Sequence, residues 1–141
     1  MILLPQTTEY ALRAALHLAA THPRSVPGAA LATAVGAPAN YLSKTLNRLV
    51  RAGVLASTRG PTGGFRLVDA PKDVTLEQIV RVFSTSGPRR CLLGTGPCGS
   101  NPDCAVHAQW APIGASVDAF LRSTTLATGQ SVFSNRTTRS L

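Results

Sequence analysis

The hydrophobic pattern of this chain changes its period near Gly53, and this change constrains the fold more than any other feature. Before it, residues 28–35 and 38–52 carry apolar side chains at helical spacing, with Gly36 between the two segments. After it, residues 54–58 and 65–68 are two short apolar runs around a Gly/Pro-rich loop, residues 59–64. Two helices joined by a glycine turn and followed by a β-hairpin predict a winged helix-turn-helix.

Helical spacing also marks a helix before this unit. Residues 8–20 predict a first helix that ends before Pro23, with Thr7 as its N-cap and Glu9 in its first turn. We expect its buried side to carry Leu12, Ala15, Leu16 and Ala19. In the helix at residues 28–35, we expect Ala30, Leu31 and Ala34 to face inward.

Two further helices follow the hairpin. The pattern Thr75-x-x-Gln78 is typical of a capping box and predicts a helix that runs to about Phe83. Apolar residues then recur every three or four positions near the C-terminus, which predicts a last helix with an apolar stripe made of Trp110, Ile113, Val117, Phe120 and Leu121. The predicted fold class is therefore mainly α with a small β-wing.

The charge of +8 is concentrated in the first part of the chain. Residues 1–90 hold eleven Lys/Arg and four Asp/Glu, whereas residues 91–141 hold three and two. A basic first part favours a polyanion such as DNA as its partner. With six acidic residues in all, no paired carboxylates, no phosphate loop and no nucleophile–base set, the sequence does not predict an enzyme. Without a membrane-spanning run or a secretory signal, we expect a cytoplasmic protein.

The segment from residue 38 to 52 has the composition of a recognition helix. Opposite its leucines, it carries polar side chains suited to base edges and phosphates: Asn40, Tyr41, Ser43, Lys44, Asn47 and Arg48. In the hairpin loop, Arg59 is placed to enter a minor groove, and Thr62 lies in the same loop. Taken singly, each of these residues also fits an ordinary solvated surface; taken together with the wing and the charge, they predict a DNA-binding surface.

Three cysteines lie within fourteen residues of one another, at Cys91, Cys98 and Cys104, with His107 following. An odd number of clustered cysteines argues against a structural disulfide framework. Thiolates bind iron–sulfur clusters or zinc, and they also act as redox groups without a metal. The spacing C-x6-C-x5-C lacks the tight turn of most zinc sites, and it leaves all three chemistries open.

Several motifs together resemble the IscR, NsrR and RirA family of iron–sulfur winged-helix transcription regulators. They are Thr-Glu-Tyr-Ala-Leu-Arg at 8–13, Tyr41-Leu-x-x-x-Leu-x-x-Leu49, Ala52-Gly-Val54 and Ser57-x-Arg-Gly-Pro-x-Gly-Gly-Phe-x-Leu67. The resemblance covers roughly residues 1–125 and includes the Thr75 helix ahead of the cysteines. Ser43 departs from the IscR-like pattern, which has Glu there, so the base preference of IscR is not carried over.

The resemblance implies a homodimeric repressor that binds palindromic double-stranded DNA under the control of an iron–sulfur cluster, 4Fe-4S or 2Fe-2S. It implies that the three cysteines are ligands and that the stripe from Trp110 to Leu121 forms the dimer interface. The fourth ligand is Glu9, which matches the NsrR-like position across the dimer, or His107, which matches the IscR-like one. We favour Glu9, because a ligand on the first helix joins the sensor to the DNA-binding domain.

The expected organisation has four parts. Residues 1–83 form the DNA-binding domain, 84–107 the cysteine loop, 108–130 the dimerisation helix region and 131–141 a disordered tail. A change in the order of the cysteine loop would shift the loop and the helix before it against the recognition helix, and so alter DNA binding. Nitric oxide, iron status, an oxidant and the redox state of the cluster all remain open as the signal.

Overall fold

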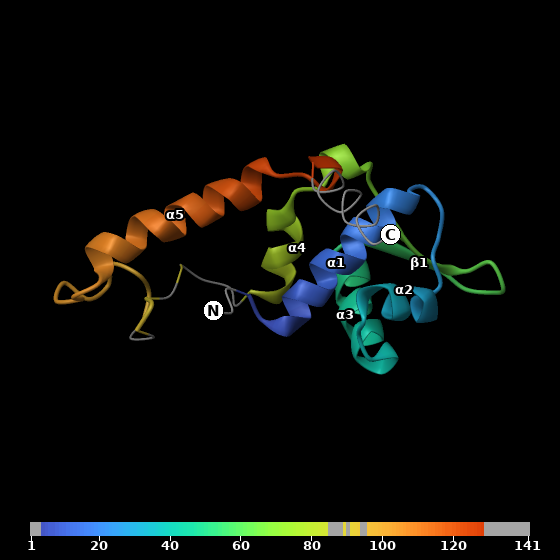
Figure 1. The fold of residues 1–141 in the computed structure, drawn as a ribbon, viewed down its shortest axis with the longest axis horizontal. Helices are drawn as coiled ribbons and strands as arrows, with labels where there is room; N and C mark the ends of the chain where they lie inside the picture. The colour runs from blue at the N-terminus through green and yellow to red at the C-terminus, as the bar shows by residue number, and fades with distance from the viewer. Residues whose placement is uncertain (1–3, 85–88, 90, 94–95, 129–141) are drawn as a thin grey trace, which may run out of the picture.

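A computed structural model describes residues 4–84, 89, 91–93 and 96–128. Figure 1 shows the first four helices and a β-hairpin gathered together, with the last helix projecting from them as a long arm. The elements in chain order are α1 (Gln6–Thr21), α2 (Gly28–Val35), α3 (Ala39–Arg51), β1 (Leu55–Thr58), β2 (Gly64–Leu67), the 3-10 turn η1 (Pro71–Asp73), α4 (Leu76–Phe83) and α5 (His107–Ser123). This is the mainly helical arrangement with a small β-wing that the sequence predicts.

Helix α1 forms the centre of the core and contacts α2, α3, α4 and β2. Its core-facing residues are mostly small, and Ala11, Ala14 and Ala15 are fully buried. Small side chains allow neighbouring elements to approach α1 from several sides. For this reason the expected inward positions Leu12 and Leu16 are only partly buried at the margins, while Ala15 and Ala19 lie in the core as expected.

The start of α1 also differs from the prediction. The helix begins at Gln6 with Pro5 at the N-cap, and no side chain caps it. Thr7 lies inside the helix, where its hydroxyl hydrogen-bonds to the hydroxyl of Tyr41. The Pro5 carbonyl accepts from the Thr8 and Glu9 N–H groups at 2.9 and 3.1 Å, so the helix starts two residues earlier than expected and the expected Thr7 cap was wrong.

Helices α2 and α3 form the helix-turn-helix. Gly36 closes α2 in the left-handed conformation, with φ of 73°. The buried residues of α2 are Leu31, Ala32 and Val35, so the prediction was right for Leu31 but wrong for Ala30 and Ala34, which are exposed. A helix of eight residues presents one narrow face, and its two bulkiest side chains, Leu31 and Val35, set that face one position later than expected.

Strands β1 and β2 pair antiparallel, from Leu55 opposite Leu67 to Thr58 opposite Gly64. A third segment joins them, because Val26 and Phe65 exchange both backbone hydrogen bonds at 2.9 Å. The wing is thereby tied to the linker that leads into α2. The sequence offered no periodic signal for this pairing, since Val26 is a single apolar residue between Ser25 and Pro27.

Helix α4 begins with the predicted capping box. The Thr75 hydroxyl accepts from the Gln78 backbone N–H at 3.3 Å, and the Gln78 side-chain oxygen accepts from the Thr75 N–H at 3.2 Å. Both orphan donors at this helix end are satisfied, which confirms the prediction.

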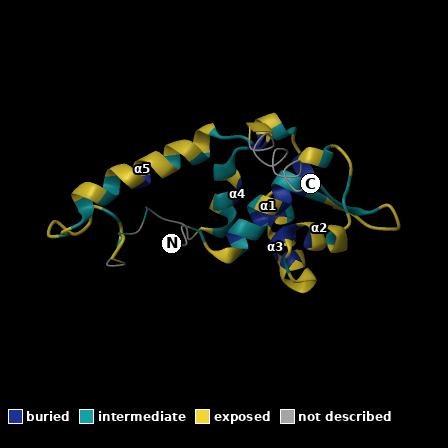
Figure 2. Cartoon of the chain, viewed as in Figure 1, coloured by how far each residue is buried: buried dark blue, intermediate teal, exposed yellow. Residues whose placement is uncertain are grey.

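Helix α5 forms the arm, and only Gly114 of its 17 residues is buried (Figure 2). After the arm, the chain returns to the globular part: Thr125 bridges to Thr75, and Leu126, donating its N–H to the Val74 carbonyl, is fully buried in the core. The core therefore includes a residue from beyond the predicted 1–83 domain.

In the described part of the chain, no helix is both long and apolar enough to cross a membrane. The predicted disordered tail, residues 131–141, lies outside the described residues. The division into four parts remains a prediction.

Candidate functional site

The outer face of α3 carries the predicted DNA-reading residues. Leu42, Leu46 and Leu49 are fully buried against the core, which fixes the opposite face toward solvent. All six polar candidates on that face are exposed: Asn40, Tyr41, Ser43, Lys44, Asn47 and Arg48. The helix therefore has the two-sided character that a recognition helix needs.

Tyr41 is exposed, but its side chain contacts α1. Its ring packs edge-on against Tyr10 of α1, with ring centroids 5.8 Å apart, and its hydroxyl bonds to that of Thr7. Gln6 in turn donates to the Tyr10 hydroxyl at 3.0 Å. This cluster joins the start of the recognition helix to the first turns of α1.

Arg48 is likewise engaged within the domain. Its guanidinium donates to the Val82 carbonyl at 2.8 Å and lies 4.6 Å from the centre of the Phe83 ring. Val82 and Phe83 are the last two residues of α4. Sequence reasoning missed this contact, because nothing in the spacing of positions 48 and 83 marks them as neighbours.

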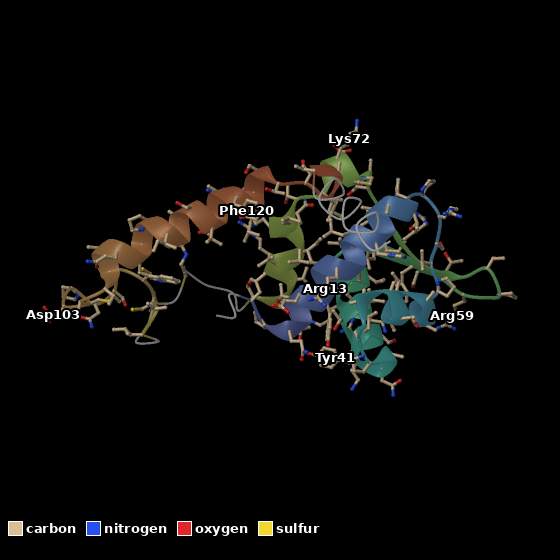
Figure 3. All side chains as sticks on the ribbon, in the orientation of Figure 1. Arg13, Tyr41, Arg59, Lys72, Asp103 and Phe120 are labelled. Atoms are coloured by element: carbon tan, nitrogen blue, oxygen red, sulfur yellow. The ribbon has the colours of Figure 1, made fainter. Side chains whose placement is uncertain are left out.

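The hairpin loop projects from the compact part of the molecule (Figure 1), and Arg59 and Thr62 in it are exposed. Figure 3 shows Tyr41 and Arg59 on the same lower side of the molecule. The exposed residues of the recognition helix and of the wing are thus accessible to a ligand. The individual contacts to DNA stay predictions.

The cysteines and His107 lie together at the free end of the arm, in two pairs. The Cys91 and Cys104 sulfurs are 3.5 Å apart, and the Cys98 sulfur is 3.4 Å from Nδ1 of His107, the first residue of α5. All four residues are partly buried. Among the described side chains, no three Cys, His, Asp or Glu residues form a single metal-binding group, so the four potential ligands are arranged two by two.

An unpredicted arginine fastens this region to the arm. The Arg89 carbonyl accepts from the Cys98 N–H at 2.6 Å, and its guanidinium forms an ion pair with Asp118 on α5. The guanidinium lies against Gly114, where a Cβ would come within 2.6 Å of Arg89 Cζ. The sequence signal for this close approach of Arg89 to α5 was Gly114 itself, a glycine beside the apolar stripe of the helix.

Within one chain, Glu9 does not lie with the three cysteines and His107. It lies in the first turn of α1, and α1 is well separated from the free end of the arm, which Asp103 marks in Figure 3. A Glu9 ligand would therefore have to come from a second copy of the chain.

The predicted dimer stripe is largely uncovered. Ile113, Val117 and Phe120 are 54%, 37% and 57% exposed, and Trp110 and Leu121 are partly buried. In most proteins the apolar face of a helix packs against other elements of the same chain. The apolar face of α5 has little such packing.

Comparison with known proteins identifies the family. The family model Rrf2, described as an iron-dependent transcriptional regulator, matches residues 4–128. The chain belongs to the Rrf2 family. Its members and relatives are transcriptional regulators rather than enzymes, and the resemblance to IscR-type regulators is confirmed.

Among Rrf2-family relatives, an rrf2-like HTH-type regulator of Rhodobacter capsulatus is 34% identical over 134 residues, which is 88% of this chain and 89% of that protein. The regulator IscR of Vibrio atlanticus is 30% identical over 118 residues, covering 83% of this chain and 68% of IscR. The structure of CymR, titled the global cysteine regulator of B. subtilis, has a TM-score of 0.78 and 26% identity, covering 94% of this chain and 98% of CymR. These matches establish a DNA-binding transcription regulator with a winged helix.

Proposed function

We propose that this Rrf2-family regulator is a homodimeric repressor whose binding to a palindromic operator is controlled by an iron–sulfur cluster on Cys91, Cys98 and Cys104. The observation that carries this proposal is the pairing of Cys91 with Cys104 and of Cys98 with His107 at the free end of the arm. The exposed face of α3 and the wing supply the surface for DNA.

The two pairs fit the donor set of an iron–sulfur centre. Two thiolates on one tetrahedral metal at about 2.3 Å are about 3.8 Å apart, close to the 3.5 Å between the Cys91 and Cys104 sulfurs. A 2Fe-2S cluster takes two protein ligands on each iron, and a 4Fe-4S cluster takes one on each. Ligands grouped in pairs therefore support the 2Fe-2S type.

The same pairing supports His107 as the fourth ligand. Its Nδ1 already lies 3.4 Å from the Cys98 sulfur, within one chain. The alternative, Glu9, requires the dimer to bring α1 of one copy to the cysteines of the other. When bound, the cluster would supply an oxidisable, nitric-oxide-reactive centre, and ligation by histidine makes it easier to lose than ligation by four cysteines.

Anaerobic reconstitution with iron and sulfide tests the cofactor and its fourth ligand together. We expect about two irons and two sulfides per chain, together with visible absorption and a Mössbauer spectrum of two inequivalent iron sites. His107→Ala should shorten the lifetime of the cluster and change this spectrum, while Glu9→Ala should leave both unchanged. Loss of the cluster in Glu9→Ala alone would make Glu9 the ligand, and no bound iron or sulfide in the wild-type chain would refute the cluster.

A thiol switch without metal is the second candidate, and the 3.5 Å separation of the Cys91 and Cys104 sulfurs favours it specifically. Oxidation would form one S–S bond and release two protons and two electrons, which an added oxidant such as hydrogen peroxide accepts. A chain that binds no iron but forms this disulfide reversibly, with a change in DNA affinity, would establish the second candidate.

A further inference from the structure

Arg48 connects the recognition helix to the end of α4, and this connection carries an inference about how the sensor acts. The Val82 carbonyl is among the last four of α4, which have no partner inside the helix. Arg48 Nη2 supplies that partner from α3 at 2.8 Å. Its positive charge also lies where the helix dipole favours a cation.

A second contact holds the same guanidinium. The Phe83 ring lies 4.6 Å below it, a distance at which a cation is attracted to the face of an aromatic ring. The planar guanidinium serves both contacts at once, which a lysine could not reproduce. A movement of either Val82 or Phe83 would therefore change the contacts of the Arg48 guanidinium.

The two residues that Arg48 holds are the last of α4, and Cys91 follows only eight positions after Phe83. On α3, Arg48 lies one turn after Lys44 and two turns after Tyr41, on the same exposed face. A displacement of the end of α4 would thus act directly on the helix that carries the DNA-reading residues.

We propose that Arg48 is a positioning residue that transmits the state of the cysteines to the recognition helix through Val82 and Phe83. This inference rests on the proposed function, in which the state of the cysteines changes DNA binding. It assigns Arg48 a role inside the protein instead of the phosphate contact expected from the sequence.

The test compares Arg48→Gln and Phe83→Leu with the wild-type chain. Arg51→Gln is the matched control, because Arg51 is on the same helix and exposed, and its side chain makes no hydrogen bond or ion pair with the rest of the described chain. The probe is a labelled double-stranded DNA fragment that the wild-type chain selects from a random library. Fluorescence anisotropy gives its affinity for the chain reconstituted with iron and sulfide and for the chain oxidised with diamide.

We expect the ratio of these two affinities to fall about fivefold or more in both Arg48→Gln and Phe83→Leu, and to be unchanged in Arg51→Gln. The slope of log affinity against log salt should change no more in Arg48→Gln than in the control. The inference would be overturned if both variants kept the wild-type ratio of affinities while the salt slope of Arg48→Gln fell in magnitude by about one. Arg48 would then be a phosphate contact. Equal affinities for both states in the wild-type chain would refute the proposed control by the cysteines, and this inference with it.

Discussion

Single residues at the free end of the arm determine how the cysteines are held. Arg89 holds Cys98 through its carbonyl and Asp118 through its guanidinium. Gly114 leaves the space that the guanidinium occupies, and it is the one buried residue of α5. The ion pair is partly exposed, so its own contribution to stability is small. We expect the ion pair to fix the position of Cys98 instead.

Gly114→Ala tests this arrangement. The new Cβ would lie 2.6 Å from Arg89 Cζ and 2.7 Å from Nε, so the guanidinium must move, and we expect its ion pair with Asp118 to weaken. We expect Cys98 in the metal-free chain to react several-fold faster with iodoacetamide, followed by peptide mass spectrometry. The melting temperature should change little, because alanine stabilises a helix by about 0.5–1 kcal/mol over glycine and offsets the lost ion pair. Ser116→Ala, at an exposed site two positions on, is the control and should leave the reaction rate of Cys98 unchanged. An unchanged rate in Gly114→Ala would show that the Arg89–Asp118 ion pair does not hold Cys98 in place.

At the scale of elements, the wing depends on the backbone segment beside it. Strand β2 pairs with β1 on one side and with Val26 on the other. Gly64, at the start of β2, has φ of 150°, and its Cα faces the backbone of the Val26–Pro27 linker. The wing that carries Arg59 is therefore positioned by the linker that precedes α2.

We expect Gly64→Ala to lower the free energy of unfolding by about 1–3 kcal/mol and to weaken DNA binding. A Cβ at this position would come within 2.7 Å of the Pro27 nitrogen, and the backbone there cannot move without breaking the Val26 pairing. Gly60→Ala is the control, since Gly60 also has a positive φ, of 105°, but no described atom within 4 Å of its Cβ position. Urea unfolding measures both variants, and equal losses would show that the close approach at Gly64 has no effect.

Two helix ends defined by local chemistry could be predicted from the sequence, although the Thr7 cap, also a local prediction, was wrong. The Thr75 capping box and the Gly36 helix end depend on residues within a few positions, and both were found where expected. The buried face of α1 depends on which helices surround it, and its small alanines, not Leu12 and Leu16, determine that packing. Likewise, the spacing of the cysteines predicted a shared site but not the pairing of Cys91 with Cys104 and of Cys98 with His107.

The whole molecule is asymmetric, with its wing and its cysteines at opposite ends (Figure 1). The arm that separates them presents an uncovered apolar stripe. Full burial of each large side chain in this stripe would contribute about 1.5–3 kcal/mol, which favours association of two arms. If the two arms pair antiparallel, the cysteines of one copy would also lie toward the DNA-binding part of the other.

Phe120→Asp should prevent the proposed dimer from forming, because a carboxylate would be buried in the apolar interface. Sedimentation equilibrium should then give 14.7 kDa in place of twice that mass. Ala115→Asp adds the same charge at an exposed position on the opposite side of α5 and should stay dimeric. A dimer that persists in Phe120→Asp would place the interface elsewhere.

The burial of Leu126 has a consequence for how the chain is made. Its side chain fills a core otherwise built from residues 11–79, and its N–H bonds to Val74. During synthesis, domains fold as their residues leave the ribosome. The complete core of this winged helix includes residue 126, which emerges after the cysteines and the whole arm. The nascent chain therefore receives the last residue of this core only after Cys91, Cys98 and Cys104 have been made.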